Sequence, residues 1–358
     1  MKSIPEINFE EVTGRDGNLG LITLTRTQVL NALNHVMFNA LNEQLAEWES
    51  ANHIKAVVIR AAEGRAFCAG GDIRYAYERK MANDPKLADF FRDEYRVNRH
   101  IHNYTKPYIA LIDGITMGGG VGISVHASHR VATDRLVFAM PETGIGFYPD
   151  VGTTYILARL PHKIGFYLGL TGARILLSDC VATGLINYAA NRDIFPELIY
   201  RLADTSFEGD QRESVTQVIQ ELAIPAGESS LWEHREKIAN CFDKKTVEEI
   251  VQALENYPSE WCQDVATILK TKSPTSLKVT FHALQEAATM EFDDSIQMEY
   301  RLTSRFIEGY DFFEGIRAIV IDKDQKPHWK PATLAGVTQS EIMKYFSPLE
   351  LTKFPQII

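Results

Sequence analysis

The 358-residue chain is long enough for one large domain with an accessory unit, or for two modest domains. Its composition, 45% hydrophobic and 23% charged, is that of a globular protein rather than a disordered one. The net charge of −10 opposes non-specific binding to nucleic acid, and no apolar run approaches the ~20 residues that span a bilayer.

The four cysteines are scattered without a Cys-x-x-Cys pair, which argues against a zinc ribbon or a disulfide framework. The first six residues include an acid and lack an apolar segment, so we expect no export or transit signal. These features predict a reducing compartment. We expect the cytoplasm, or the mitochondrial matrix if the chain is a processed form.

The first half of the chain alternates short strands with helices. Strands are expected over 19–25, 55–60 and 107–112, and the helical spacing of apolar residues over 34–50 predicts an amphipathic helix. This alternation predicts an α/β layer architecture.

Two of these strands are followed by glycines and then by a helical stretch. Gly70 and Gly71 follow the second strand, and Gly118 to Gly120 follow the third, ahead of a helix expected over 121–128. Such junctions present free backbone N–H groups at a helix start. Two junctions side by side could direct one N–H each onto the oxyanion of an ester or thioester.

From about residue 190 helical patterns dominate. Helical regions are expected over 207–222, 244–256, 295–321 and 340–346, and Ser273-Pro274 is typical of a capped helix start. A polar, proline-broken connector occupies 322–331. We therefore predict a core over residues 1–190 and a helical accessory region over 191–358.

Other common sites are disfavoured. The glycine triplet does not continue as GxGxxG, because Ile123 stands where the last glycine is required, and no GxxxxGK[ST] occurs. A serine-hydrolase GxSxG fails at His126, and Ser124 is better explained as a packing residue. His126 and His129 lack a nearby third metal ligand, so no metal site is expected.

Several carboxylates are candidates for chemistry. Glu142 lies among apolar residues, which raise the pKa of a carboxyl and suit it to acid–base work, although it could instead tie down its loop. Asp150 precedes an apolar helix and could act in the site, cap that helix, or do both. Asp72 is expected mainly to cap a helix, with ligand contact as the alternative. From composition alone, we expect Glu94 to be a solvent-exposed charge on the face of a helix.

The segments Ala66–Ile73 and Gly114–Gly120 resemble those of the crotonase (enoyl-CoA hydratase/isomerase) superfamily. Further similarity at Met140–Thr143, Phe147–Gly152 and 311–325 spreads over nearly the whole chain, with few recognisable motifs around 190–270. The resemblance implies a core of repeated ββα units followed by the helical C-terminal region. It also implies an acyl-CoA substrate.

The resemblance also implies roles for particular residues. The backbone N–H groups of Ala69 and Gly119 would bind the thioester oxygen, Glu142 and Asp150 would be the catalytic acids, and Glu94 would contact substrate. Other implied or candidate substrate contacts are Gly70, Gly118 and Asp72 in the loops, and Arg26 and Leu30 at the place where the family contacts CoA.

Gly122 stands where the hydratases of this superfamily carry their first catalytic glutamate. This departure favours hydrolysis over hydration. The resemblance to the hydrolase branch of the superfamily implies a short, branched β-hydroxyacyl-CoA substrate from valine breakdown. The alternatives are a hydratase or isomerase of the same fold and a non-catalytic binding protein. No cofactor beyond the CoA of the substrate is expected, nor a nucleic-acid or membrane partner, and a homo-oligomer is one option.

Overall fold

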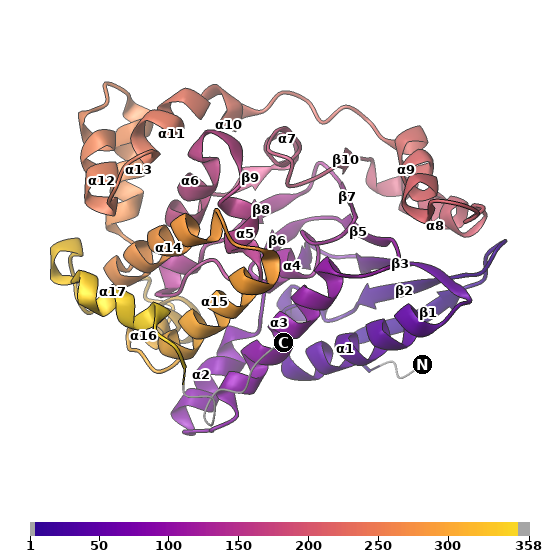
Figure 1. Ribbon diagram of the computed structural model, residues 1–358, viewed down its shortest axis with the longest axis horizontal. Coiled ribbons are helices and arrows are strands. Elements are labelled where there is room, and N and C mark those ends of the chain that lie inside the picture. The colour runs from indigo at the N-terminus through magenta and orange to yellow at the C-terminus, as the bar shows by residue number, and fades with distance from the viewer. Residues whose placement is uncertain (1–3, 350–358) are drawn as a thin grey trace. The chain divides into compact units, whose positions relative to one another are not determined.

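The structure, a computed structural model, describes residues 4–349 (Figure 1). The chain divides into two compact units. One unit comprises the chain up to Gly71, Arg96–Phe138 and Ile175–Ser230. The other comprises Asp72–Tyr95, Ala139–Arg174 and the chain from Leu231 onward. Each unit is assembled from separate segments of the chain. The division into residues 1–190 and residues 191–358 stays a prediction.

The first unit is built on a six-stranded sheet with the strand order β1-β2-β3-β5-β7-β10. β1 pairs with β2 antiparallel, and the other neighbours pair parallel. Parallel sheets are buried on both faces, which explains uninterrupted apolar runs such as Val57-Val58-Ile59. The strands are β1 (Ile7–Val12), β2 (Asn18–Leu24), β3 (Ile54–Ala61), β5 (Tyr108–Ile112), β7 (His129–Ala132) and β10 (Tyr188–Ala189).

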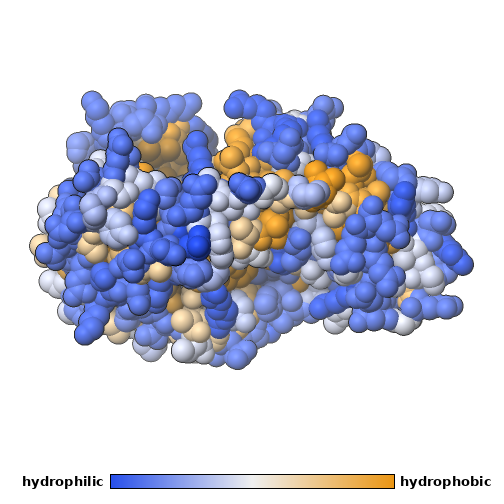
Figure 2. All heavy atoms as spheres, turned by 90° about the horizontal axis from the view of Figure 1, so that it is seen from above, coloured by the Kyte–Doolittle hydropathy of each residue, from blue (hydrophilic) through white to orange (hydrophobic). Residues whose placement is uncertain are grey.

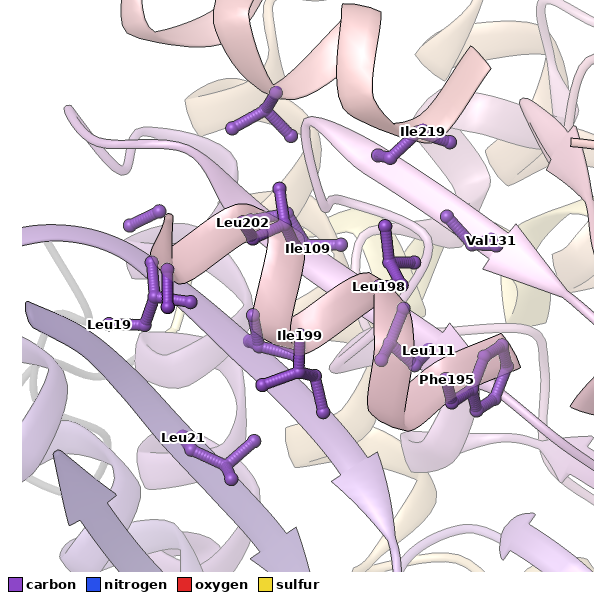
Figure 3. Packing of buried hydrophobic residues seen from close by; sticks show 14 of the residues in the cluster. Leu19, Leu21, Ile109, Leu111, Val131, Phe195, Leu198, Ile199, Leu202 and Ile219 are labelled. Carbon is purple, nitrogen blue, oxygen red and sulfur yellow. The ribbon is translucent and has the colours of Figure 1, made fainter. Parts of the chain in front are cut away.

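Alternate residues of β2 face different helices, as the two-residue period of a strand requires. Gly20 lies so close to the Trp48 indole of α1 (His35–Ser50) that a Cβ there would be 2.5 Å from the ring. Leu19 and Leu21 belong to a core cluster with α8 (Phe195–Ala203). Figure 3 shows Phe195, Leu198, Ile199 and Leu202 of α8 near Leu19, Leu21, Ile109, Leu111 and Val131 of the sheet.

A smaller sheet has the strand order β4-β6-β8-β9. Helix α4 (Gly119–Gly122) follows β6 after the single residue Gly118. It packs closely against β4, as a Cβ on Gly120 would stand 2.1 Å from the Cys68 carbonyl oxygen. Only glycine permits this approach. The strands are β4 (Ala66–Cys68), β6 (Ile115–Met117), β8 (Val137–Ala139) and β9 (Ile175–Leu176).

The remaining helices of the first unit are short, apart from α9. Helix α3 (Leu87–His102) is divided between the units, with the part up to Tyr95 in the second and the part from Arg96 in the first. The others are η1 (Thr27–Val29), α7 (Leu177–Ala182), η4 (Arg192–Ile194) and α9 (Gln211–Leu222).

The second unit is almost entirely helical. Ser273 caps α14 through the Ser276 N–H, with Pro274 at the first helical position, as the sequence predicts. Its helices are α2 (Ile73–Met81), η2 (Glu142–Ile145), α5 (Thr153–Leu157), η3 (Pro161–Lys163), α6 (Ile164–Thr171), α10 (Ser230–Glu233, which begins at the last residue of the first unit), α11 (Arg235–Phe242), α12 (Val247–Asn256), α13 (Glu260–Lys270), α14 (Pro274–Ala287), α15 (Phe292–Phe306), α16 (Asp311–Ile316), the π-helical turn η5 (Arg317–Ile321), η6 (Leu334–Gly336) and α17 (Gln339–Phe346).

The expected strands and the expected helix over 34–50 are confirmed, but four helical predictions were too long. The helix expected over 244–256 begins only at Val247. The region 121–128 holds only the end of α4, followed by turns. Helix α9 begins at Gln211 because the Asp210 side chain caps it. The region 295–321 is three elements, since the helix that begins at Phe292 ends at Phe306.

The visible surface is mainly hydrophilic, with hydrophobic areas between polar ones on the face shown in Figure 2. Among the residues described, none of the helices has the length and apolar character needed to cross a membrane. The exposed large apolar side chains come from many separate elements and are Val29, Val36, Met81, Leu176, Tyr200, Ile224, Ile268, Tyr310 and Met343.

Two glycines of α6 give a matched test of packing in the second unit. A Cβ on Gly165 would stand 1.7 Å from the Leu157 carbonyl oxygen, whereas one on Gly169 would be 3.3 Å from a Leu284 methyl group. We expect Gly165→Ala to destabilise the protein by about 1–3 kcal/mol, because backbone must move. Gly169→Ala should be neutral or slightly stabilising. Thermal unfolding of both variants measures this, and equal stabilities would contradict the packing described.

Candidate active site

Three of the predicted acids, Glu94, Glu142 and Asp150, belong to the second unit and are buried there. Like-charge repulsion from Asp150 raises the pKa of both Glu94 and Glu142, and the charge of Glu142 also raises that of Glu94. A group of buried carboxyls with raised pKa values is typical of a catalytic site.

Glu142 begins the η2 turn directly after Pro141 and is 6% exposed. Burial, and then the charge of Asp150, hold the pKa of its carboxyl well above the usual range. Its Oε2 has no hydrogen-bond partner in the described part of the chain. A buried carboxylate oxygen without a partner is costly unless it serves a substrate or water.

Asp150 lies in the loop before α5 and is 5% exposed. Its Oδ2 accepts a 2.6 Å hydrogen bond from the Tyr95 hydroxyl. Burial raises the pKa of Asp150 to about 7, and the bond from Tyr95 opposes this increase. The alternative that Asp150 caps α5 with its side chain is wrong, because the Glu299 carboxylate accepts the Gly152 and Thr154 N–H groups.

Glu94 lies in α3 and is 3% exposed, so the solvated position expected from composition is wrong. Burial is the largest cause that raises the pKa of its carboxyl, followed by the charges of Asp150 and Glu142. Composition misleads here because the neighbouring helix residues are charged, while the face that carries Glu94 is covered.

Asp72 has the structural role that the sequence favoured. Its Oδ1 accepts the Tyr75 N–H at 3.3 Å and so caps α2. Contact of Asp72 with substrate stays a prediction.

The glycine loops of the first unit lie beside each other. A Cβ built on Gly70 would be 3.6 Å from the Gly119 nitrogen, and Gly118 has a φ of 48° that favours glycine. As the first residue of α4, Gly119 has an N–H without an acceptor inside its helix. Its N–H is therefore a candidate oxyanion donor. Gly122 is buried and places no carboxylate in this helix.

The Ala69 N–H is less suitable as the second donor than expected. It donates a 2.9 Å hydrogen bond to the carbonyl of Leu30, a residue in the left-handed region with a φ of 55°. Leu33 forms a parallel bridge with Gly71 in which the Leu33 N–H bonds to the Gly70 carbonyl. In a parallel bridge with this hydrogen-bond pattern, the N–H of Gly71 does not bond to Leu33. The Gly71 N–H is therefore a candidate oxyanion donor.

The predicted CoA contacts at Arg26 and Leu30 flank the η1 turn. The Arg26 guanidinium donates to the Ala32 carbonyl at 2.8 Å, and the Asn31 N–H bonds to the Arg26 carbonyl. Asn31 ties the segment to β4 by donating from its amide to the carbonyls of Ala66 and Phe67. The segment is therefore fixed against the loop that carries Gly70.

Sequence reasoning missed Tyr95, Tyr148, Glu299 and Thr303, which surround Asp150 in the second unit. No spacing signal could have found them, because up to 208 positions separate the bonded residues. As for metals, no group of three or more His, Cys, Asp or Glu side chains in residues 4–349 could hold an ion.

The model of the family described as enoyl-CoA hydratase/isomerase matches residues 19–346. The mitochondrial 3-hydroxyisobutyryl-CoA hydrolase of Rattus norvegicus is 42% identical over 345 residues, which are 95% of this chain and 89% of the relative.

Solved structures give the same fold. A carnitinyl-CoA dehydratase from Mycobacterium thermoresistibile has a TM-score of 0.88 and 35% identity, with 98% of each chain covered. An enoyl-CoA hydratase from Rhodobacter sphaeroides 2.4.1 has a TM-score of 0.84 and 35% identity, covering 95% of this chain and 97% of the other.

Proposed function

We propose that this chain, which belongs to the enoyl-CoA hydratase/isomerase (crotonase) family, is a thioester hydrolase. Its proposed substrate is 3-hydroxyisobutyryl-CoA. The relatives of this name are similar over nearly the whole chain. The buried pair of Glu142 and Asp150 carries the proposal, because both carboxyls have pKa values raised above the ordinary range, as acid–base chemistry in a hydrolase requires. Gly122, in place of the hydratase glutamate, favours hydrolysis over hydration.

The reaction needs N–H groups that donate hydrogen bonds to the thioester oxygen, and it needs one base. The Gly119 N–H would stabilise the tetrahedral oxyanion together with a second N–H from the segment Ala69–Gly71. We favour Gly71 for the second donor, because the Ala69 N–H is already bonded to Leu30. Ala69 would serve only if substrate displaces the Leu30 carbonyl.

Glu142 has two routes to the same products. As a general base, its carboxylate removes a proton from water, whose oxygen attacks the carbonyl carbon. As a nucleophile, it attacks the carbonyl itself and forms a mixed anhydride that water then opens. In both routes the C–S bond breaks, and the CoA thiolate takes a proton. Asp150 would bind the 3-hydroxyl or the water and supply that proton.

The pH dependence follows from the raised pKa values. Because the Glu142 base must be ionised and its pKa is raised, we expect kcat/KM to fall as pH decreases through a limb well above the ordinary carboxyl range. Asp150→Asn removes the charge that raises the pKa of Glu142, so the limb of its residual activity should move to lower pH. A pH–rate profile of both proteins checks this, and an unmoved limb would contradict the coupling.

The second candidate is a hydratase or dehydratase, which the names of the two similar solved structures favour. A panel of acyl-CoA thioesters, followed with a thiol-reactive dye, separates the two. We expect fast CoA release from 3-hydroxyisobutyryl-CoA and slower release from straight-chain and unsaturated thioesters. No release from any member of the panel would overturn the proposal.

The names of the relatives bear on the cellular setting. The similar hydrolases are named as mitochondrial, and we propose the cytoplasm or the mitochondrial matrix for this chain. We propose no cofactor other than the CoA of the substrate and leave a homo-oligomer as an option.

A further inference from the structure

The backbone turns sharply directly after Asp150. Val151 has a φ of 56°, which is unfavourable for a β-branched residue, and Gly152 follows with a φ of 79°. The Asp150 carbonyl accepts both the N–H of Thr153, at 2.9 Å, and its hydroxyl, at 2.6 Å. Such a turn persists only where surrounding groups hold it.

Glu299 holds this turn. It lies in α15, is fully buried, and its Oε2 accepts the Gly152 N–H at 2.6 Å. Its Oε1 accepts the N–H of Thr154 at 3.0 Å and the Thr154 hydroxyl at 2.5 Å. One carboxylate therefore caps α5 and fixes the residue two positions after Asp150.

Thr303, one helical turn after Glu299, fixes the side chain of Asp150 through Tyr95. The Thr303 hydroxyl is 2.5 Å from that of Tyr95, which donates its single proton to Asp150 at 2.6 Å. Thr303 is therefore the donor to Tyr95. The Tyr148 hydroxyl lies 2.9 Å from Thr303 and donates to the Glu299 carbonyl.

We propose that α15 positions Asp150: Glu299 holds the turn that carries its backbone, and Thr303 orients the tyrosine that holds its carboxylate. The inference rests on the proposed function, in which Asp150 meets the substrate. Glu299, Thr303 and Tyr95 act through Asp150 and are positioning residues.

Isosteric changes test each contact. A glutamine at 299 has one oxygen and one NH₂, so it cannot accept both the Gly152 and the Thr154 N–H groups. Thr303→Val removes the hydroxyl at nearly constant size. Tyr95→Phe removes the bond that lowers the pKa of Asp150. The titratable groups around Asp150 are Glu94, Glu142, Tyr95, Tyr148 and Glu299, and each test variant changes at most one of them.

The experiment measures kcat and KM for CoA release from 3-hydroxyisobutyryl-CoA in Glu299→Gln, Thr303→Val and Tyr95→Phe. We expect Glu299→Gln to lower kcat about 10–100-fold with little change in KM, because a displaced group loses its productive geometry. The exposed Glu286→Gln and Tyr310→Phe are matched controls that should leave both constants unchanged.

A second measurement does not depend on activity. The infrared band of the protonated Asp150 carboxyl, assigned by its absence in Asp150→Asn, is followed against pH. We expect its midpoint to move to higher pH in Tyr95→Phe and in Thr303→Val, and to stay constant in Tyr310→Phe.

The outcomes separate the two claims. A purely structural role would reduce the folded fraction and leave both kcat per folded molecule and the Asp150 midpoint unchanged, which would overturn the inference. If the wild type releases no CoA, the proposed function fails. The infrared titration then still decides whether α15 positions Asp150.

Discussion

Glu142→Gln is expected to lower kcat for CoA release by about 10²–10⁴-fold, the usual contribution of a general base. The amide keeps the size of the side chain but can neither take a proton from water nor form an anhydride. Because Glu142 is buried with a raised pKa and an unpartnered Oε2, the uncharged amide should not destabilise the fold. Steady-state kinetics with substrate at saturation measures the effect.

The control for Glu142→Gln is Glu286→Gln, an exposed glutamate in the same unit. Its kcat should equal that of the wild type. If Glu142→Gln turns over within about threefold of the wild type, the base lies elsewhere, since a loss of 10²-fold or more is the lower bound for such a group.

Gly120→Ala is expected to abolish most activity by displacing the backbone, without removing any catalytic side chain. The added Cβ would stand 2.1 Å from the Cys68 carbonyl oxygen, so α4 and β4 must separate. That shift moves the Gly119 N–H, and loss of one oxyanion donor typically costs about 10²–10³ in rate. We also expect lower thermal stability, because the clash involves backbone rather than a side-chain end.

Gly64→Ala provides the matched control in the same unit. The nearest atom to its added Cβ is 3.6 Å away, an ordinary van der Waals contact. Kinetics and thermal unfolding of the two variants should differ sharply. A Gly120→Ala protein with lowered stability but wild-type kcat would show that the Gly119 N–H does not act on the reacting oxygen.

The parts of the fold that could be predicted are those with local causes. The helix α1 follows from apolar spacing and from the Asn34 side chain, which caps it through the Met37 N–H. The strands follow from short apolar runs. The length of α15 could not be predicted, because apolar spacing continues past Phe306 although the helix ends there.

The candidate site was predictable only in part, for a similar reason. Glu142 could be singled out by its apolar neighbours, but the burial of Glu94 depends on segments far away in the chain. The hydrogen bond from the Ala69 N–H depends on the left-handed conformation of Leu30. That conformation could not be predicted, because the residue is not a glycine. Glu299 caps a helix about 150 positions before it, as its bond to Gly152 shows, so local capping rules pointed to Asp150 instead.

The central claim is that the chain hydrolyses a thioester rather than adding or removing water at a double bond. Incubation of 3-hydroxyisobutyryl-CoA in H₂¹⁸O, followed by mass spectrometry, tests it most directly. We expect free CoA in equal amount to a free acid that carries ¹⁸O in its carboxylate. An unsaturated acyl-CoA with its thioester intact, and no free CoA, would contradict it.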